Sequence, residues 1–221
     1  MTRKMAGAVA LCFPRALSEF GATTRQMQTR GRQRVNRRGS ILIITGAREL
    51  GKTTLCTRLA EASHSVGWTA AGLLSPARFV DGKKVGIEAE DVSTRQRFLL
   101  ARLRTGSAAP TDPGTDRWSF DPRVLAWGNA VLQKAVPCDL LVVDELGPLE
   151  LERQQGWIAG LTAIDSKSYQ CAVVVVRPEL LEKACTYWPS AQVFRLEPNA
   201  PAGTVLAQLT EQILSGRNSN A

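Results

Sequence analysis

The sequence has little of what zinc-binding or membrane-spanning proteins need. Its 221 residues contain one histidine, His64, and five cysteines that form no C-x-x-C pair. Because cysteine and histidine are the usual ligands of structural zinc, no zinc site is expected. No apolar run approaches the roughly 20 residues that a helix needs to cross a bilayer. The hydrophobic content of 44% and the charged content of 22% are ordinary for a globular domain.

The greater part of the chain also lacks a net charge. The whole sequence carries +8, from 28 basic and 20 acidic side chains. Nine of the basic and one of the acidic side chains lie within residues 1–40, so residues 41–221 carry 19 of each. A domain that binds nucleic acid normally carries a basic excess on its own surface. We interpret residues 41–216 as one folded domain, and the sequence predicts no nucleic-acid partner for it.

Residues 1–40 form a basic segment, and residues 217–221 form a short C-terminus that we expect to be flexible. The N-terminal segment is rich in Arg, Gln, Thr and Gly without a sustained apolar period, which predicts disorder. We favour a solvated extension, with Met27 as an alternative start of the chain. An organellar transit peptide or a basic arm that contacts nucleic acid or acidic membrane also fits. A secretory signal fits least, since Pro14 and Arg15 interrupt the short apolar stretch. We expect a cytoplasmic protein and leave organellar import open.

The most informative stretch fits G-x-x-x-x-G-K-[ST], the phosphate-binding loop of nucleoside triphosphatases. Its glycines let backbone N–H groups point at a triphosphate, and the following helix directs its positive end there. Lys52 is expected to reach the outer phosphates, and the hydroxyl of Thr53 to bind Mg²⁺. The apolar run 41–44 predicts a strand before the loop, and Leu55 and Leu59 indicate a helix after it. The expected nucleotide-binding residues are Gly46, Ala47, Arg48, Glu49, Leu50, Gly51, Lys52, Thr53 and Thr54.

Two acids at the end of a second apolar run form the next candidate motif. The run Leu140–Val143 predicts a buried strand, and Asp144 and Glu145 follow it directly. Ligands bind at the carboxyl ends of strands in open α/β sheets. In enzymes with a phosphate loop, the first acid of this strand holds Mg²⁺. Asp144 is therefore the predicted metal-binding carboxylate, and Glu145 the predicted group that activates the attacking water.

The rest of the chain predicts an α/β protein in which strands alternate with helices. We expect strands over 68–74, 171–176 and 192–196, and helices over 122–135, 154–164, 178–185 and 203–215. Two alternating runs, 84–92 and 97–102, predict an inserted β-meander. Residues 105–116 predict a loop and a candidate lid. The expected fold is the three-layer P-loop NTPase fold, with a mostly parallel sheet, helices on both faces and the inserted meander.

Three arginines are candidates for stabilising charge on the transferred phosphoryl group. Such enzymes usually need an arginine in addition to the loop lysine. Arg78 follows a predicted strand, and Arg177 lies at the carboxyl end of the strand 171–176. We rank both above Arg48, which lies within the loop itself. A surface ion pair remains the alternative role for each of them.

The motifs together resemble the thermophile-type nucleoside triphosphatases, the P-loop family related to the human cancer-related nucleoside triphosphatase. The similarity covers about residues 41–200, and the segments that carry it are 46–54, 72–78, 86–91 and 144–151. The resemblance implies Mg²⁺-dependent hydrolysis of ATP, GTP and other nucleoside triphosphates. It also implies that Lys52 and Thr53 are phosphate and Mg²⁺ ligands.

The same resemblance extends to Arg78, to the pair of Asp144 and Glu145, and to Glu150. The chain departs from the family pattern at several positions, which indicates a divergent member. These positions are Pro76-Ala77, Ile87, Pro148-Leu149 and Asn199-Ala200.

Two other function classes remain open from the sequence. A nucleotide or small-molecule kinase uses the same phosphate loop, but it needs an acceptor pocket and an arginine-rich lid. The loop 105–116 has only Arg104 and Arg117 at its borders, which argues against such a lid. The other alternative is an adaptor for cofactor assembly that binds a nucleotide without hydrolysing it. The pair of Asp144 and Glu145 favours hydrolysis over both.

Overall fold

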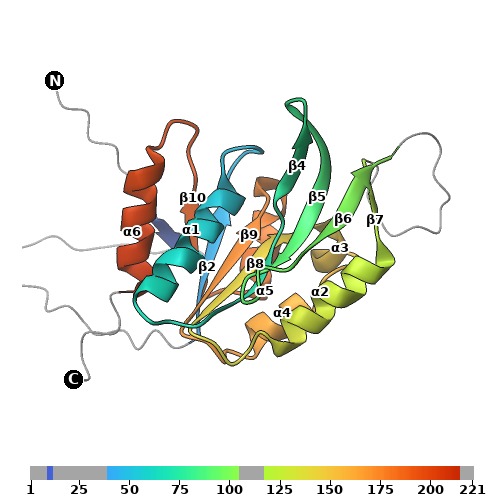
Figure 1. Cartoon of the computed structure of the whole chain (residues 1–221). Coiled ribbons are helices and arrows are strands. Elements are labelled where there is room, and N and C mark those ends of the chain that lie inside the picture. Colours follow the sequence, from blue (N-terminus) through green and yellow to red (C-terminus); the bar gives the residue numbers. More distant parts are fainter. Residues whose placement is uncertain (1–8, 12–38, 105–116, 215–221) are drawn as a thin grey trace, which may run out of the picture.

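The computed structural model describes residues 9–11, 39–104 and 117–214 (Figure 1). Most of the predicted N-terminal extension therefore lies outside the described residues, except Val9–Leu11, Gly39 and Ser40. The predicted loop 105–116 and the predicted flexible C-terminus, 217–221, lie outside them too. Within the described ranges, no helix is long and apolar enough to cross a bilayer.

A ten-stranded mixed sheet forms the centre of the molecule. Its main path has the order β1-β10-β2-β9-β8-β3-β5-β6-β7, and β4 pairs with β5. The five strands from β10 to β3 are parallel, whereas β1 and the strands β4 to β7 pair antiparallel. The strands are β1 (Val9–Leu11), β2 (Ser40–Thr45), β3 (Ala70–Leu74), β4 (Ala77–Val80), β5 (Lys83–Asp91), β6 (Arg97–Leu103), β7 (Trp118–Phe120), β8 (Leu140–Leu146), β9 (Cys171–Val176) and β10 (Gln192–Arg195).

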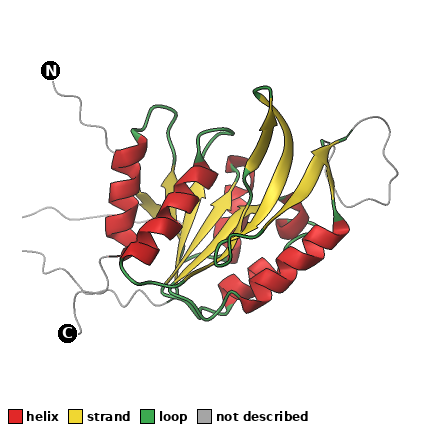
Figure 2. Cartoon of the chain, in the orientation of Figure 1, coloured by secondary structure: helices red, strands yellow, loops and turns green. Residues whose placement is uncertain are grey.

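Helices cover both faces of this sheet (Figure 2). The helices α1 (Lys52–Ser65) and α6 (Ala202–Leu214) pack against each other on one face. On the other face, α2 (Pro122–Lys134) packs against α4 (Ile158–Asp165), beside the short α3 (Pro148–Leu151), η1 (Pro178–Leu180) and α5 (Leu181–Tyr187). The predicted three-layer α/β architecture is therefore confirmed.

Alternation along the central strands explains the two layers of core. In β2, Ile41 and Ile43 belong to the core under α2 and α4, whereas Leu42 and Ile44 belong to the core under α1 and α6. Successive side chains of a strand point to opposite faces, so a strand covered on both sides must be apolar throughout. The continuous apolar runs of the sequence are therefore the buried parallel strands.

Several predicted elements differ from the structure at their boundaries. The helix expected over 154–164 begins only at Ile158. Gln154 and Gly156 have φ values of 55° and 70°, a left-handed conformation in which a right-handed helix cannot propagate. The strand expected from Trp68 begins at Ala70. The sequence also missed β4 and β7, which are only four and three residues long, and β1, which lies in the segment expected to be disordered and pairs with β10.

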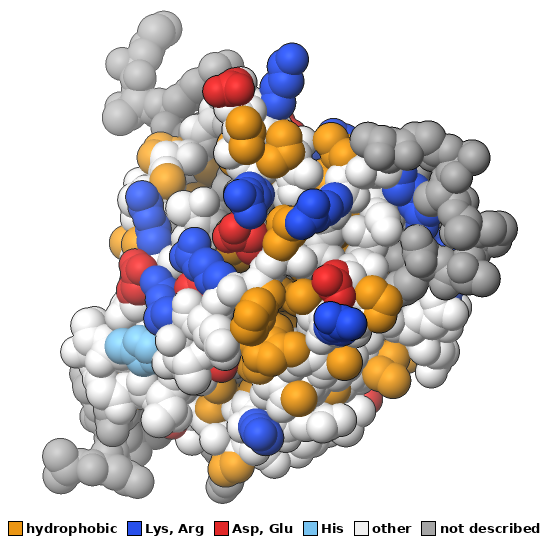
Figure 3. Space-filling model, turned by 45° about the vertical axis from the view of Figure 1, so that its right-hand side comes forward, with side chains coloured by type: hydrophobic (Ala, Val, Ile, Leu, Met, Phe, Trp, Pro, Cys, Tyr) orange, Lys and Arg blue, Asp and Glu red, His pale blue; other side chains and the backbone are white. Residues whose placement is uncertain are grey.

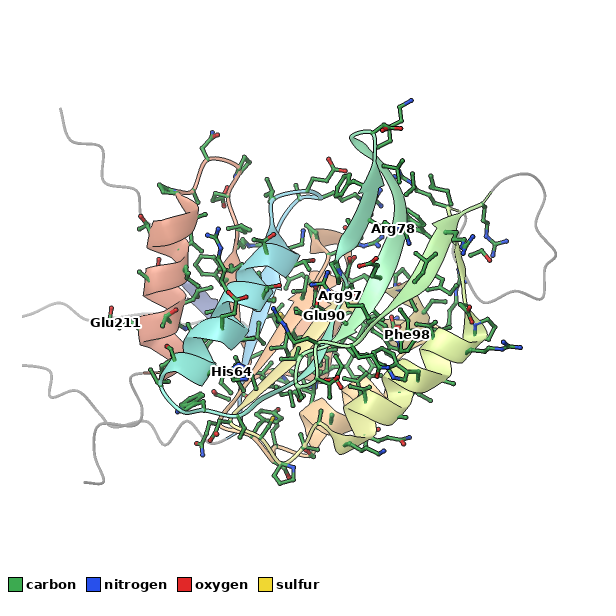
Figure 4. All side chains as sticks on the ribbon, in the orientation of Figure 1. His64, Arg78, Glu90, Arg97, Phe98 and Glu211 are labelled. Carbon is green, nitrogen blue, oxygen red and sulfur yellow. The ribbon has the colours of Figure 1, made fainter. Side chains whose placement is uncertain are left out.

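The predicted meander exists, and it extends the main sheet. Its strand β5 pairs antiparallel with β3, and β6 and β7 follow in order. Glu90 on β5 is 1% exposed and receives ion pairs from Arg97 at 2.7 Å and Arg95 at 3.2 Å (Figure 4). Because a buried carboxylate needs compensating charge, these contacts fix the turn between β5 and β6. Arg95 also reaches Glu61 on α1, at 3.4 Å.

Candidate active site

The predicted phosphate loop connects the end of β2 to the start of α1. It requires glycine at two positions for different reasons. A Cβ on Gly46 would lie 2.7 Å from the carbonyl oxygen of Leu196, the residue after β10. Gly51 has a φ of 82°, which side-chain-bearing residues rarely adopt, although the space around it is open. The two glycines of the sequence motif are therefore explained by a close approach and by a left-handed turn.

The first turn of α1 offers free N–H groups at the end of this loop. The helix begins at Lys52, directly after Gly51, and no described side chain caps it. It also has no acidic residue in its first turn. The first N–H groups of a helix have no partner within the helix, and the helix dipole makes this end positive. An anion such as a phosphate group fits this position.

Lys52 folds back over the loop in this structure. Its amine donates hydrogen bonds to the carbonyl oxygens of Gly46, at 2.9 Å, and Ala47, at 2.6 Å. Burial lowers the pKa of Lys52, and the nearby carboxylates of Glu145 and Asp144 act in the opposite direction. The amine therefore lies in the electrostatic field of both predicted acids. The phosphate loop and the second motif form one site.

Asp144 is buried at the end of β8, with 1% of its surface exposed. The backbone N–H of Ser75 donates to its carboxylate at 3.0 Å. The Ser75 hydroxyl donates to the carbonyl oxygen of Asp144. Burial raises the pKa of Asp144 from 3.8 to about 6, and the hydrogen bond from Ser75 and the nearby Thr53 hydroxyl oppose that rise. Asp144 thus joins the end of β3 to the first turn of α1.

Glu145 leaves the strand ladder and forms an ion pair. The register between β8 and β9 shifts between Asp144 and Leu146, so Glu145 falls at the irregularity. Its carboxylate accepts from the guanidinium of Arg177, which follows β9. About a third of the Glu145 side chain is exposed, so a water molecule can reach it. The structure brings Glu145 and Arg177 together at the edge that also carries the phosphate loop.

The other two candidate arginines have no such contact. The side chains of Arg78 and Arg48 are exposed, and neither forms an ion pair with a described residue. Arg78 lies on β4, in the hairpin that β4 forms with β5 (Figure 4). The role of Arg78 at the transferred phosphoryl group, which the family resemblance implies, therefore stays a prediction.

The buried side chain of Glu150 holds the loop between β8 and α4 by hydrogen bonds. It is 6% exposed and accepts hydrogen bonds from the N–H groups of Gly147 and Trp157, each at 2.9 Å. Burial raises its pKa. A Cβ on Gly156 would lie 2.1 Å from its carboxylate, so the loop packs closely around it. The structure gives Glu150 a supporting position behind Glu145.

Sequence reasoning missed two residues at this edge, Ser75 and Lys84. Ser75 follows β3, so the rule that ligands bind beyond the carboxyl ends of parallel strands could have found it. Lys84 lies on β5, half-buried, and burial lowers its pKa whereas the carboxylate of Glu145 raises it. Lys84 comes close to the site only because the meander folds back against the sheet, so no local sequence signal indicates its position.

The donors at this site suit a hard cation that is bound together with a phosphate group. The oxygens of Thr53 and Asp144 are adjacent, and hydroxyl and carboxylate oxygens are ligands that Mg²⁺ accepts. Among the described residues, no group of three or more His, Cys, Asp or Glu side chains forms a metal cage. Mg²⁺ commonly binds through one or two protein ligands plus substrate phosphates and water. The residues present therefore fit Mg²⁺.

A separate cavity of about 510 Å³ lies between α2 and α4. Two of its lining residues, Val136 and Ser166, precede β8 and β9, so it opens near the opposite edge of the sheet. Its walls contain no charged side chain among the described residues. This cavity is separate from the candidate active site, which lies at the carboxyl ends of the parallel strands.

Comparison with known proteins agrees with this geometry. A sequence model of the family described as NTPase matches residues 41–197. Nucleoside-triphosphatase THEP1 of Methanopyrus kandleri is 30% identical over 112 residues, which are 50% of this chain and 59% of that protein. THEP1 of Thermococcus kodakarensis is 26% identical over 176 residues, which are 78% of this chain and 95% of that protein. The match spans less than two thirds of the first of these relatives.

Two solved structures share the fold. The human cancer-related nucleoside triphosphatase has a TM-score of 0.63 at 19% identity and covers 81% of this chain and 100% of its own. THEP1 from Aquifex aeolicus has a TM-score of 0.57 at 15% identity, covering 78% of this chain and 98% of its own. At these identities the likeness establishes the fold alone.

Proposed function

This chain belongs to the NTPase family, and from that premise we propose that it is a Mg²⁺-dependent nucleoside triphosphatase. Its reaction is the hydrolysis of ATP, GTP and other nucleoside triphosphates to the diphosphate and phosphate. The observation that carries the proposal is the proximity of the Thr53 hydroxyl to the Asp144 carboxylate, which lowers the pKa of Asp144. This proximity supports a single site that joins the phosphate loop and the second acidic motif.

The phosphate loop binds the triphosphate. The phosphate oxygens accept hydrogen bonds from the free N–H groups at the start of α1 and in the curled loop before it. The Lys52 amine exchanges its bonds to Gly46 and Ala47 for bonds to the outer phosphates. Charge-assisted bonds to phosphate are stronger than bonds to neutral carbonyl groups, which favours this exchange.

Thr53 and Asp144 hold Mg²⁺ in this proposal. When bound, Mg²⁺ neutralises the charge that develops on the phosphate oxygens. Asp144 must be ionised for this role, and its pKa of about 6 leaves it mostly ionised at neutral pH. The hydrogen bond from Ser75 holds the carboxylate in place from the side of β3.

Glu145 orients the attacking water and accepts its proton. Its partial exposure supports this role, as does its position at the irregularity between Asp144 and Leu146, where it has no paired residue on β9. Arg177 holds the carboxylate by their ion pair. A fixed carboxylate can position a water molecule without a further loss of side-chain freedom.

Phosphate release from purified protein tests the proposal directly. ATP, GTP, CTP and UTP are each incubated with and without Mg²⁺, and with no added acceptor. The proposal predicts phosphate release that stops when the metal is chelated. Tight nucleotide binding without release would instead favour the adaptor, and release that requires an added acceptor would favour the kinase.

A further inference from the structure

Lys84 is a half-buried lysine on β5 whose amine lies against an aromatic ring. Among the described residues, it forms no ion pair. Its amine lies 5.5 Å from the centre of the Trp118 ring, and the guanidinium of Arg117 lies 5.4 Å from the same ring. Trp118 is 7% exposed, so the indole is a fixed platform. The ring therefore restricts where the Lys84 amine can lie.

The charged groups that face Lys84 come from every side of the active site. They are Glu145 at the end of β8, Glu49 in the phosphate loop, Arg177 after β9 and Arg117 before β7. In Figure 1 the hairpin of β4 and β5 rises above the same edge of the sheet as the loop that follows β2. Lys84 thus faces the active site from the meander, opposite the phosphate loop.

Positive charge is in excess around this position. Arg117 and Arg177 each lie within electrostatic range of Lys84, and Arg177 already neutralises Glu145. Basic side chains also lie across the upper half of the meander side of the molecule (Figure 3). Three cations (Lys84, Arg117 and Arg177) and two carboxylates (Glu145 and Glu49) therefore meet here, which leaves one positive charge in excess for a bound anion to compensate. A phosphate group supplies such an anion.

The two arginines favoured by the sequence fit the transferred phosphoryl group less well. The guanidinium of Arg177 is engaged by Glu145, and Arg78 is exposed on β4. A cation other than the loop lysine is nevertheless expected in enzymes of this type. Lys84 is half-buried, faces the site and is unpaired among the described side chains.

We propose that Lys84 binds the terminal phosphate of the nucleotide and stabilises the negative charge that grows there during hydrolysis. This inference rests on the proposed nucleoside triphosphatase function. The oxygen of water bonds to the terminal phosphorus, and the proton of that water goes to Glu145. The bond from phosphorus to the bridging oxygen breaks, and its electron pair leaves with the diphosphate. Lys84 and Lys52 contact the transferred group from opposite sides.

Three variants of the full-length protein test this role. Lys84→Met keeps the apolar stem against Trp118 and removes the charge, and Lys84→Arg restores a cation. Lys83→Met is the matched control, since Lys83 is the preceding, exposed residue of the same strand. We expect Lys84→Met to lower kcat about 100-fold, the typical loss when one donor to developing charge is removed. KM should rise about tenfold with the lost contact to the bound terminal phosphate, Lys84→Arg should recover most of kcat, and Lys83→Met should match the parent.

A binding measurement separates this inference from the proposed function. Dissociation constants are measured for ADP and for the non-hydrolysable β,γ-imido analogue of ATP. Lys84→Met should weaken binding of the analogue about tenfold and leave ADP binding unchanged, since a bond to a charged group is lost. If the parent never releases phosphate but this selective loss appears, the proposed function fails and the Lys84 site stands. If Lys84→Met binds both nucleotides as the parent does and keeps its kcat, the inference is wrong.

Discussion

The hydroxyl of Thr53 lies close enough to the carboxylate of Asp144 to lower its pKa, so the first turn of α1 meets the end of β8. The two residues are far apart in the sequence, and each belongs to a different motif. Asp144 is also held by Ser75 at the end of β3. The ends of β3 and β8 and the first turn of α1 therefore meet at the carboxyl ends of the parallel strands. This convergence makes the account testable residue by residue.

Lys52→Ala should remove tight binding of nucleoside triphosphates. The amine bonds directly to the backbone of the loop, and losing one charged partner in a buried contact costs about 2–5 kcal/mol. The expected loss in affinity is at least about 30-fold. Isothermal titration with the β,γ-imido analogue of ATP measures it. Lys183→Ala, at an exposed lysine on α5, is the control and should bind as the parent does.

Gly46→Ala should destabilise the fold and weaken nucleotide binding together. The added Cβ would lie 2.7 Å from the Leu196 carbonyl oxygen, so the loop must move away from β10. Such overpacking costs about 1–3 kcal/mol. Gly203→Ala on α6 is the matched control, because nothing lies within 4 Å of its added Cβ. Denaturant unfolding should therefore separate the two variants, and equal stability would contradict the close approach at Gly46.

The stability of the nucleotide-free protein should depend on Asp144 at mildly acidic pH. Burial raises its pKa from the ordinary 3.8 to about 6, so between these two pH values the folded protein binds more protons than the unfolded protein does. The free energy of unfolding should then increase as the pH falls through that range. The rise corresponds to about 3 kcal/mol, at about 1.4 kcal/mol per pH unit.

Denaturant unfolding at neutral pH and near pH 5, without Mg²⁺, measures this effect. Asp144→Asn lacks the titrating group and is the reference for every other carboxylate. The difference between the parent and Asp144→Asn should shift in favour of the parent at the lower pH. If the difference in unfolding free energy between the two proteins does not change with pH, the pKa of Asp144 is not raised in the folded protein.

Hydrolysis should respond to acid in the opposite direction. Mg²⁺ binds the ionised carboxylate, so protonation of Asp144 near pH 6 should weaken the metal site. The Mg²⁺ concentration that gives half-maximal phosphate release should therefore rise as the pH falls below about 6. A constant Mg²⁺ requirement between neutral and mildly acidic pH would argue against Asp144 as the metal ligand.

The sequence predicted those parts of the fold that local chemistry determines. The run Cys171–Val176 is a strand with the predicted bounds, because six small or β-branched apolar residues leave little alternative. The cap of α2 was also readable, since Asp121 accepts from the N–H of Arg123 at 2.8 Å and Pro122 follows it. The phosphate loop could be predicted for the same reason, because the local backbone conformation requires its glycines and places its lysine.

Long-range contacts could not be read in the same way. The sequence offered Arg177 as a cation for the phosphoryl group, but only the fold pairs it with Glu145. Lys84 was overlooked because its neighbours come from the phosphate loop, β8, β9 and β7. The shortness of β7 and the left-handed residues before α4 also blurred the local periodicity. Roles at the site therefore depend on folded geometry more than on motif spacing.

Glu145→Gln tests the central claim most directly, because glutamine keeps the shape of the side chain and cannot accept the proton of water. Phosphate release with saturating ATP and Mg²⁺ is measured beside the dissociation constant of the β,γ-imido analogue, and Glu152→Gln, at an exposed acid after α3, is the control. The account predicts that Glu145→Gln binds the analogue like the parent and loses about 100-fold or more in turnover. Hydrolysis by Glu145→Gln at the parental rate would contradict it.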